Sequence, residues 1–262
     1  NYLMEKKIKI LIIGGSGYVG SKICEYLIKN TIFSIKNVDV NKSRYPNISK
    51  QINYNLLSQK YINSFKFIII LAAHSSSKKC IEDKMGAIKN NIIDLEDLLV
   101  KIKRSSAIPI FISTTAVYNN FKHPGKEKAK ILNKNLLNLY DISKRYIEVF
   151  IQNKLKQFYI LRLGTVSGKS PNQDKNLIVN KMHFDATTKK YITTVAENSK
   201  KSILFINDLC KSIEIILKNK KQYFGIYNIN SLNMTVGKIA KNISKFYNVP
   251  ILKKKGMSGY TF

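Results

Sequence analysis

The sequence of 262 residues contains few cysteines, and nothing in their placement pairs them. Cys24, Cys80 and Cys210 lie far apart, without a CxxC motif and without a histidine at metal-ligand spacing. An odd number of scattered cysteines indicates reduced thiols that pack as small apolar side chains. The sequence therefore supports neither a disulfide framework nor a zinc site, and we predict no bound metal.

Long hydrophobic runs are missing as well. The longest uninterrupted apolar stretch covers residues 67–73, whereas a membrane-spanning helix needs ~18 such residues. The first 13 residues alternate lysine with isoleucine and lead directly into a glycine cluster, which is not the pattern of a signal peptide. We therefore expect a globular cytoplasmic protein with no membrane partner, whose natural start is Met4.

Arginine and acidic residues are scarce beside lysine. The chain has 45 lysines and arginines, of which only four are arginine, against 16 acidic residues, for a formal net charge of +29. Such a charge is compatible with nucleic-acid binding, because basic side chains neutralise phosphates. Base readout favours arginine, however, and the lysines are spread evenly among abundant asparagine and isoleucine, which share A/T-rich codons. We interpret the excess as compositional bias and expect anionic small molecules, not nucleic acid, as partners.

The first 160 residues alternate short β-branched apolar runs with longer stretches of helical periodicity, which is typical of βαβ units around a parallel sheet. Strands are expected at 8–13, 34–39, 67–71, 108–113 and 158–161, and helices at 18–29, 91–103 and 140–154. After residue 168 we expect helices at 177–189, 208–218 and 236–246, with strands at 203–205 and 226–229. The pattern predicts an α/β protein with a Rossmann-type doubly wound parallel sheet at 4–168 and a smaller, intertwined substrate-binding α/β lobe at 169–262.

The first predicted strand runs into a glycine-rich turn that opens an amphipathic helix. The glycines have the spacing GxxGxxG. Glycines so placed allow a tight turn, close approach of a pyrophosphate and close packing of helix on strand. The pyrophosphate then lies on the backbone amides at the helix N-terminus. This segment predicts a dinucleotide site made by Gly14, Gly17, Tyr18, Val19 and Gly20.

An acidic residue, Asp39, ends the second predicted strand, about 20 residues after the glycine loop. A carboxylate at this place accepts hydrogen bonds from the adenosine ribose and repels a 2′-phosphate, so NAD is favoured over NADP. Lys42 and Arg44 nearby leave NADP as an alternative. A purely structural interpretation is that Asp39 caps the turn at 39–43.

Two further segments carry groups suited to proton transfer. Thr114 ends a predicted buried strand, while Tyr140 and Lys144 lie four residues apart and therefore on one face of a predicted helix. An ammonium close to Tyr140 favours the phenolate, so we expect a pKa lowered toward neutral pH. The hydroxyl of Thr114 would bind the same substrate oxygen. We predict that Tyr140 takes a proton from a substrate hydroxyl while nicotinamide accepts a hydride.

Together these motifs resemble the extended short-chain dehydrogenase/reductases, the NAD-dependent epimerase/dehydratase family of nucleotide-sugar enzymes. The resemblance runs from about residue 8 to 244. It implies NAD as cofactor, a nucleotide-diphospho-sugar substrate, a homodimer, and Thr114, Tyr140 and Lys144 as catalytic residues. Further cofactor contacts implied are Asn55 and Leu56 (where the family has an Asp-Leu or Asp-Ile pair), Leu71, Ala72, Ala73 and Asn91. Implied substrate contacts are His74, Thr115, Thr165, Asn180 and Lys201, the last of which is otherwise a solvated surface lysine.

Departures from the family pattern narrow the expected reaction. The 4,6-dehydratases carry Asp-Glu directly after the catalytic threonine, where this chain has Thr115-Ala116, and the GDP-fucose synthase type has a cysteine in this segment, which is absent here. Redox chemistry at C4 of the sugar remains, as a 4-epimerase or 4-dehydrogenase. An NAD(P)H-dependent 4-keto-sugar reductase and a catalytically silent NAD-binding regulator stay as alternatives. Family members usually continue for several dozen residues, so we expect the lobe to be naturally short or truncated at Phe262.

Overall fold

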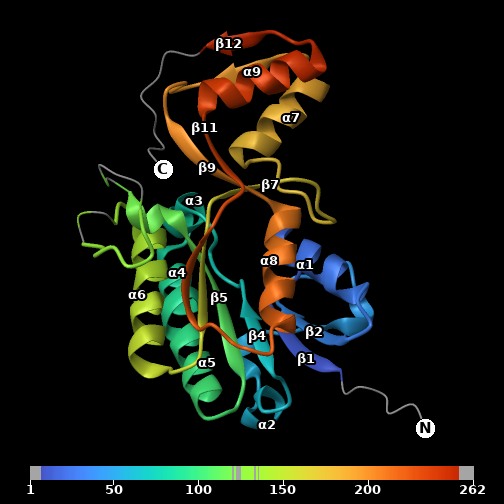
Figure 1. The fold of residues 1–262 in the computed structure, drawn as a ribbon, viewed down its shortest axis with the longest axis vertical. Helices are drawn as coiled ribbons and strands as arrows, with labels where there is room; N and C mark the ends of the chain where they lie inside the picture. The colour runs from blue at the N-terminus through green and yellow to red at the C-terminus, as the bar shows by residue number, and fades with distance from the viewer. Residues whose placement is uncertain (1–6, 120, 122–124, 133, 135, 254–262) are drawn as a thin grey trace.

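The computed structural model describes residues 7–119, 121, 125–132, 134 and 136–253 (Figure 1). Within these ranges, a central sheet holds seven parallel strands in the order β10-β6-β5-β4-β1-β2-β3. The strands are β1 (Ile8–Ile13), β2 (Phe33–Asp39), β3 (Ser49–Gln51), β4 (Phe67–Ile70), β5 (Ile108–Thr114), β6 (Tyr159–Leu163) and β10 (Gly225–Ile229). The strand order reverses between β1 and β4, and in such sheets this is where the ligand crevice opens, at the carboxyl ends.

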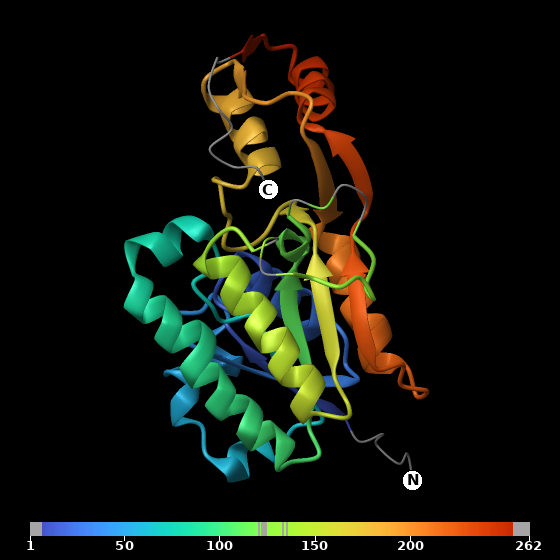
Figure 2. The same ribbon diagram turned by 90° about the vertical axis from the view of Figure 1, so that its left-hand side faces the viewer.

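The strands are nearly continuous apolar runs because helices cover both faces of the sheet. In β1, Ile10 and Ile12 join the hydrophobic cluster of α1 (Tyr18–Ile28) and α8 (Ile206–Lys218). Leu11 and Ile13 point to the opposite face and join the cluster of α5 (Asp94–Lys103) and α6 (Leu139–Lys154). Figure 2 shows the resulting three layers, with α5 and α6 on one side of the sheet and α8 on the other.

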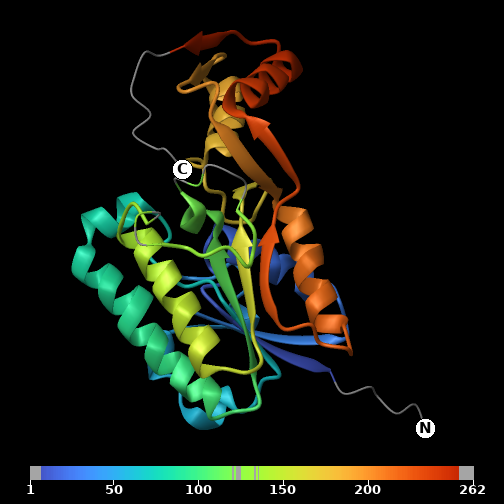
Figure 3. The ribbon, with the colours of Figure 1, turned by 60° about the vertical axis from the view of Figure 1, so that its left-hand side comes forward.

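A smaller lobe stands beyond the carboxyl ends of the sheet (Figure 3). Its strands are β7 (Thr165–Ser167), β9 (Lys200–Phe205) and β11 (Leu232–Thr235) in one sheet, and β8 (Ile192–Thr194) and β12 (Ile251–Lys253) in another. The helices α7 (Ile178–Thr188) and α9 (Val236–Tyr247) pack on these strands around a third cluster that includes Met182 and Ile239. Because β7 follows β6 after a single residue, the lobe is connected directly to the carboxyl end of the sheet.

The chain passes repeatedly between the two parts. From the C-terminal part, α8 and β10 lie with the central sheet, whereas β7, which precedes residue 168, pairs with β9 in the lobe. The limits 4–168 and 169–262 therefore stay a prediction about units of folding, and in the described chain the parts are interleaved.

Every predicted strand and helix is present, with ends shifted by up to three residues. The helix expected from residue 91 begins as a π-helical turn, η3 (Lys89–Ile93), before α5. The sequence-based analysis did not predict several short elements, because three to six residues show no usable periodicity. These are η1 (Pro46–Ile48), β3, η2 (Tyr54–Leu56), α2 (Gln59–Ile62), α3 (Ser77–Glu82), α4 (Lys84–Ile88), η4 (Thr115–Tyr118), β7, β8, β11 and β12.

Three observations complete the description of the chain. Cys24, Cys80 and Cys210 all lie in described ranges, and all are buried free thiols, as predicted. Over the described residues, no helix is both long enough and apolar enough to cross a membrane. In the same part of the chain, His, Cys, Asp and Glu side chains form no group of three suited to a metal ion.

Candidate active site

The glycine loop lies at the switch point between β1 and β4 and is packed against both. Gly14 has φ +90°, and a Cβ there would lie 2.5 Å from the backbone N of Ala72, directly after β4. A Cβ on Gly20 would collide with the carbonyl oxygen of Gly14 and approach the Cα of Gly15 to 2.6 Å. Both positions therefore require glycine for close backbone approach. Around Gly17 the nearest heavy atom is Gly14 O at 3.7 Å, so its outer side is open.

The first turn of α1 offers backbone donors to an anion. Gly17 is its N-cap, and among the described residues no side chain caps the helix there. In contrast, Asn138 caps α6 by accepting a hydrogen bond from the backbone N–H of Asp141 at 3.0 Å. Uncapped amides at a helix start, together with the helix dipole, favour negative charge. The open side of Gly17 and these amides fit a pyrophosphate.

Asp39 closes the other side of the loop. Its Oδ2 accepts a hydrogen bond from Ser16 N at 2.9 Å, and its Oδ1 accepts one from Asn41 N at 2.9 Å. The carboxylate therefore caps the following turn, as the structural interpretation predicts, and also braces the glycine loop. Its contact with a ribose stays a prediction.

Asn55 and Leu56 form part of η2 along the same edge of the sheet. The backbone oxygen of Asn55 accepts a hydrogen bond from Lys101 Nζ at 2.9 Å, and Leu56 is 72% exposed. Among the described residues, the covered Oδ1 of Asn55 has no hydrogen-bond partner. A cofactor contact at this pair is not tested by the structure.

The structure brings the three predicted catalytic residues together at the carboxyl end of β5. Thr114 is the last residue of β5, Tyr140 lies in the first turn of α6, and the Thr114 side chain is close enough to affect the pKa of Tyr140. Lys144, 6% exposed, lies one turn further along α6. Its Nζ donates a hydrogen bond to Ile112 O at 2.8 Å and lies 6.0 Å from the centroid of the Tyr140 ring.

The expectation of a lowered Tyr140 pKa is wrong for this arrangement. Burial raises the pKa of Tyr140, and the neighbouring charge of Asp141 raises it further, while the side chain of Thr114 acts in the opposite direction. Desolvation disfavours the phenolate more strongly than the nearby groups favour it. The spacing of four residues correctly placed Tyr140 and Lys144 on one helix face, but the ammonium is directed at a β5 carbonyl.

Burial acts on Lys144 as well. It lowers the pKa of the Lys144 ammonium from its usual value to about 8, and the charges of Glu148 and Cys80 oppose this effect. The pKa of Cys80 is itself raised by burial, so the thiol adds little negative charge at neutral pH. Glu148 is therefore the main group that favours the charged lysine.

Beyond β4, Asn91 links the predicted cofactor strand end to the catalytic helix. Leu71 and Ala72 donate their backbone N–H groups to Ile13 O at 2.8 and 3.0 Å, and Ala73 follows them. The buried Asn91 side chain accepts from His74 N at 2.7 Å and donates to Ser143 Oγ at 3.3 Å. The Asn91 amide thus connects the backbone at His74 with helix α6 at Ser143.

His74 has an anionic neighbour. Its Nε2 lies 3.1 Å from Asp83 Oδ2, and Asp83 in turn accepts a hydrogen bond from Gly86 N at 2.9 Å at the start of α4. This pairing places the ring against the break between α3 and α4. A contact with substrate stays a prediction.

The remaining predicted substrate residues, Thr115, Thr165 and Asn180, differ in their hydrogen bonds within the protein. Thr115 donates its hydroxyl to Leu163 O at 3.2 Å, and Thr165 lies half-buried in β7. Asn180 accepts from Gly168 N at 3.2 Å and donates to Asp174 O at 2.9 Å, so its amide is engaged within the lobe.

One alternative given for the lobe is wrong. Lys201 is only 8% exposed, and burial lowers its pKa, so it is not a solvated surface lysine. Near it in sequence, Asp208 lies in the first turn of α8, and its carboxylate accepts a hydrogen bond from Ser231 Oγ at 2.6 Å.

Sequence reasoning missed a buried ion pair behind the catalytic strand. Glu148 of α6 is 0% exposed and Arg162 of β6 is 1% exposed, and their side chains are paired at 2.6 Å. Two signals were available, namely the position of Glu148 one turn after Lys144 and the rarity of arginine in this chain. Neither signal identifies the partner, because the pairing depends on how α6 crosses β6.

The fold and the switch-point loop define a dinucleotide-binding α/β protein of the Rossmann type. Residues 10–230 match the model of the NAD dependent epimerase/dehydratase family, and the chain belongs to this family. The predicted fold class, family and cofactor are confirmed.

The relatives of known activity include both a dehydratase and an epimerase. A dTDP-D-glucose 4,6-dehydratase from Dictyostelium discoideum is 27% identical over 90% of this chain and 62% of its own length. A UDP-glucose 4-epimerase from Mycoplasma pneumoniae is 26% identical over 64% of this chain and 55% of its own length. The chain thus spans less than two thirds of the length of either relative.

Solved structures of similar fold include two 4-epimerases. The UDP-N-acetylglucosamine 4-epimerase from Methanobrevibacter ruminantium, in complex with UDP-N-acetylmuramic acid, has a TM-score of 0.81 at 20% identity and covers 95% of this chain and 86% of its own. The UDP-glucuronic acid 4-epimerase from Bacillus cereus, in complex with UDP-glucuronic acid and NAD, has a TM-score of 0.81 at 21% identity, with coverage of 94% and 85%. At these identities the similarity establishes the fold.

Proposed function

We propose that this chain oxidises and reduces C4 of a nucleotide-diphospho-sugar with NAD, as a 4-epimerase or 4-dehydrogenase. The observation that carries the proposal is the convergence of Thr114 at the end of β5 and Tyr140 at the start of α6, with Lys144 one turn along the same helix. This end of the sheet also carries the glycine loop, so proton transfer and cofactor binding share one edge.

Each residue of the site has a defined task in this proposal. When bound, NAD supplies a hydride acceptor and donor. The amides that follow Gly17 receive its pyrophosphate, and Asp39 accepts hydrogen bonds from its adenosine ribose. Thr114 orients the sugar hydroxyl, and Lys144 stabilises the phenolate form of Tyr140. In oxidation this phenolate takes the proton of the hydroxyl, and in reduction the neutral phenol returns it.

The residues after Thr114 favour redox chemistry over water elimination. Elimination needs an acid and a base beside the oxidised sugar. Here the hydroxyl of Thr115 is bonded to Leu163 O, and Ala116 carries no ionisable group. The dehydratase among the relatives shares 27% of its residues with this chain, and at that level the local motif is the better guide to the reaction.

A buried cation in the lobe supports an anionic substrate. The two neighbouring structures with bound UDP-sugars show the kind of ligand that this fold accommodates. Lys201 lies in β9 of the lobe, nearly covered by protein, and its ammonium suits one phosphate of a nucleotide diphosphate. We assign it to the substrate diphosphate.

We also propose a homodimer formed through α5 and α6. The exposed side chains on α6 between residues 142 and 149 are all apolar or aromatic, and α5 lies beside this helix (Figure 2). Tyr146 links the helices by donating a hydrogen bond to Glu96 Oε1 at 2.7 Å. On a chain with a formal charge of +29, the stretch 142–149 of α6, where no lysine is exposed, is where two copies repel each other least. The exposed apolar residues are Ile93, Val100, Ile142, Tyr146 and Val149.

The proposed function is tested by Tyr140→Phe. The variant keeps the ring and loses only the hydroxyl, so we expect unchanged NAD affinity and at least ~100-fold slower turnover, the lower end of general-base contributions. Purified protein is incubated with NAD and a panel of nucleotide sugars, and sugar products are separated by chromatography while NADH absorbance is followed. Turnover like that of the parent chain in Tyr140→Phe contradicts the mechanism. If the parent chain binds NAD but converts no sugar, the silent regulator is the better description.

A further inference from the structure

Glu148 lies one helical turn beyond Lys144 on α6, and its side chain is fully buried against β5. We propose that Glu148 is a positioning residue for the reaction, which holds Lys144 in its charged form and fixes the end of β5 that presents Thr114. The proposal rests on the proposed function, because it assigns Glu148 a task within the same site.

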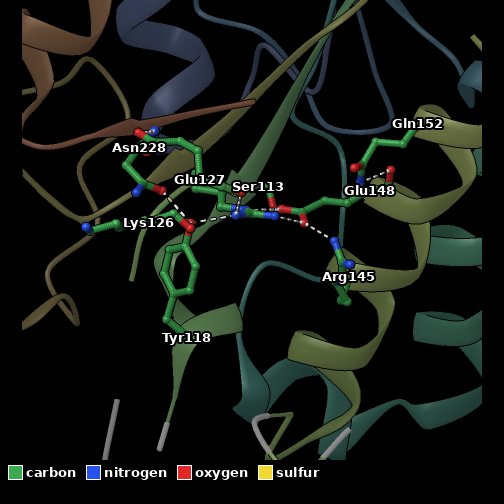
Figure 4. Close-up of polar contacts among 9 residues, drawn as sticks. Ser113, Tyr118, Lys126, Glu127, Arg145, Glu148, Gln152 and Asn228 are labelled. Carbon is green, nitrogen blue, oxygen red and sulfur yellow. Dashed lines mark hydrogen bonds and ion pairs between the residues drawn. The ribbon is translucent and has the colours of Figure 1, made fainter. Parts of the chain in front are cut away.

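Three donors from three directions fix the carboxylate of Glu148. Arg162 binds it with two hydrogen bonds, from Nε to Oε1 at 2.9 Å and from Nη2 to Oε2 at 2.6 Å. Ser113 of β5 donates its hydroxyl to Oε1 at 2.6 Å, and Arg145 donates from Nη1 to Oε2 at 3.1 Å. Figure 4 shows Glu148 with Ser113 on one side and Arg145 on the other. Because Ser113 immediately precedes Thr114, the carboxylate holds the strand end on which the catalytic hydroxyl sits.

Arg162 is itself held from the opposite side. Its Nη1 donates to the Tyr118 hydroxyl at 2.5 Å and to Glu127 O at 3.3 Å. The Tyr118 hydroxyl lies 2.9 Å from Asn228 Oδ1 of β10, to which it donates. A bidentate arginine fixed at both ends has little freedom to move, so the position of Glu148 is determined by the fold.

The charge of Glu148 acts on Lys144 because residues four apart share a helix face. Besides Glu148, Cys80 on α3 acts directly on the charge of Lys144, the Tyr140 ring lies 6.0 Å from the ammonium, and Asp141 acts on Cys80 and Tyr140. Burial lowers the pKa of Lys144 to about 8, and Glu148 is the leading cause that opposes this shift. Without the carboxylate, the cations Arg145 and Arg162 would remain nearby with no anion to balance them.

A purely structural role makes a different prediction. A buried ion pair can often be replaced by neutral side chains without loss of the fold. If Glu148 and Arg162 only joined α6 to β6, their replacement would change stability and leave the pH dependence of Lys144 unchanged. The titration of Lys144 is therefore the measurement that distinguishes a positioning role of Glu148 from a purely structural one.

The experiment measures the titration of Lys144 and the pH dependence of turnover in Glu148→Gln. Nitrogen NMR of labelled lysine side chains, with the signal assigned by its loss in Lys144→Met, gives the midpoint without cofactor or substrate. We expect this midpoint to fall by about one pH unit, the size of a charge interaction at helix-turn distance in a partly screened interior. The basic limb of the pH profile of turnover should move in the same direction.

Three further variants keep the test sharp. Glu148→Asp retains the charge, and Tyr118→Phe removes a partner of Arg162 while leaving Glu148 in place, so both should keep the parental midpoint. If Glu148→Gln folds poorly, Glu148→Gln/Arg162→Met removes both charges and should still lower the midpoint. A parental midpoint in the folded Gln variants overturns the proposal. A lowered midpoint in a chain that converts no sugar supports the effect of Glu148 on the Lys144 charge but rejects the proposed function, and with it a task for Glu148 in the reaction.

Discussion

Two glycines of the loop, Gly17 and Gly20, separate its role in folding from its role in NAD binding. Alanine adds one methyl group at either position. At Gly20 this methyl would overlap Gly14 O and lie 2.6 Å from Gly15 Cα, both backbone atoms that no side-chain rotation can move. At Gly17 the nearest atom is 3.7 Å away, and the backbone at φ −73° suits any residue. The same mutation is therefore a clash at one position and an ordinary contact at the other.

The expected effects on stability follow from this difference. Overpacking costs about 1–3 kcal/mol, and a chain of this size loses about 2–4 °C of melting temperature per kcal/mol. Gly20→Ala should therefore melt roughly 3–10 °C below the parent chain. At an N-cap, glycine is preferred over alanine by about 0.5–1 kcal/mol, so Gly17→Ala should melt only about 1–4 °C below the parent.

In the presence of NAD, Gly17→Ala becomes the more informative of the two variants. A ligand at 100 times its Kd stabilises the folded state by about 2.7 kcal/mol, or roughly 5–10 °C here. The methyl of Gly17→Ala occupies the open side that we assign to the pyrophosphate, so most of this gain should disappear. Because the chain has no tryptophan, circular dichroism of the helices is the suitable signal for the melting curves.

The two melting temperatures can also refute the argument. A Gly17→Ala variant that gains as much stability from NAD as the parent chain places the pyrophosphate elsewhere. A Gly20→Ala variant as stable as the parent shows that α1 does not pack on the loop as closely as described.

Two further predictions concern partners of the chain. Ile142→Lys places a charge on the α5–α6 face and should convert a dimer to a monomer, as measured by light scattering. The control Ile215→Lys, at a 66% exposed position on α8, should leave the mass unchanged. Equal masses in both variants argue against this interface. Lys201→Met removes one charged hydrogen bond and should raise KM for the nucleotide sugar by about 10-fold or more, with unchanged NAD affinity. Lys200 is the exposed neighbour of Lys201 in β9, so Lys200→Met should keep the KM of the parent chain. The assignment fails if Lys201→Met leaves KM unaltered.

The central sheet was predictable because its strands are buried on both faces. The run Phe67–Ile70 is apolar at every position, and such runs separated by helical periods indicate a parallel sheet. The lobe was less predictable, because β8 and β12 pair only through a contact between distant segments. Helices α3 and α4 are short and separated at Asp83, so neither shows a complete hydrophobic period.

In the site, sequence spacing identified groups but not their surroundings. Tyr140, Lys144 and Thr114 were found because their order along the chain is diagnostic of the family. The pairing of Glu148 with Arg162 joins a helix to a strand 14 positions away, and no local pattern encodes it. The pKa of Tyr140 was predicted in the wrong direction, because it depends on the depth of burial and on where the Lys144 ammonium points.

Burial acts against the charged forms of both groups: it raises the pKa of Tyr140 and lowers the pKa of Lys144 to about 8. Oxidation of a sugar needs the phenolate, whereas reduction of a ketone needs the neutral phenol that burial favours. An enzyme of this family that starts by oxidation depends strongly on whatever keeps Lys144 charged, and here the carboxylate of Glu148 is the leading candidate.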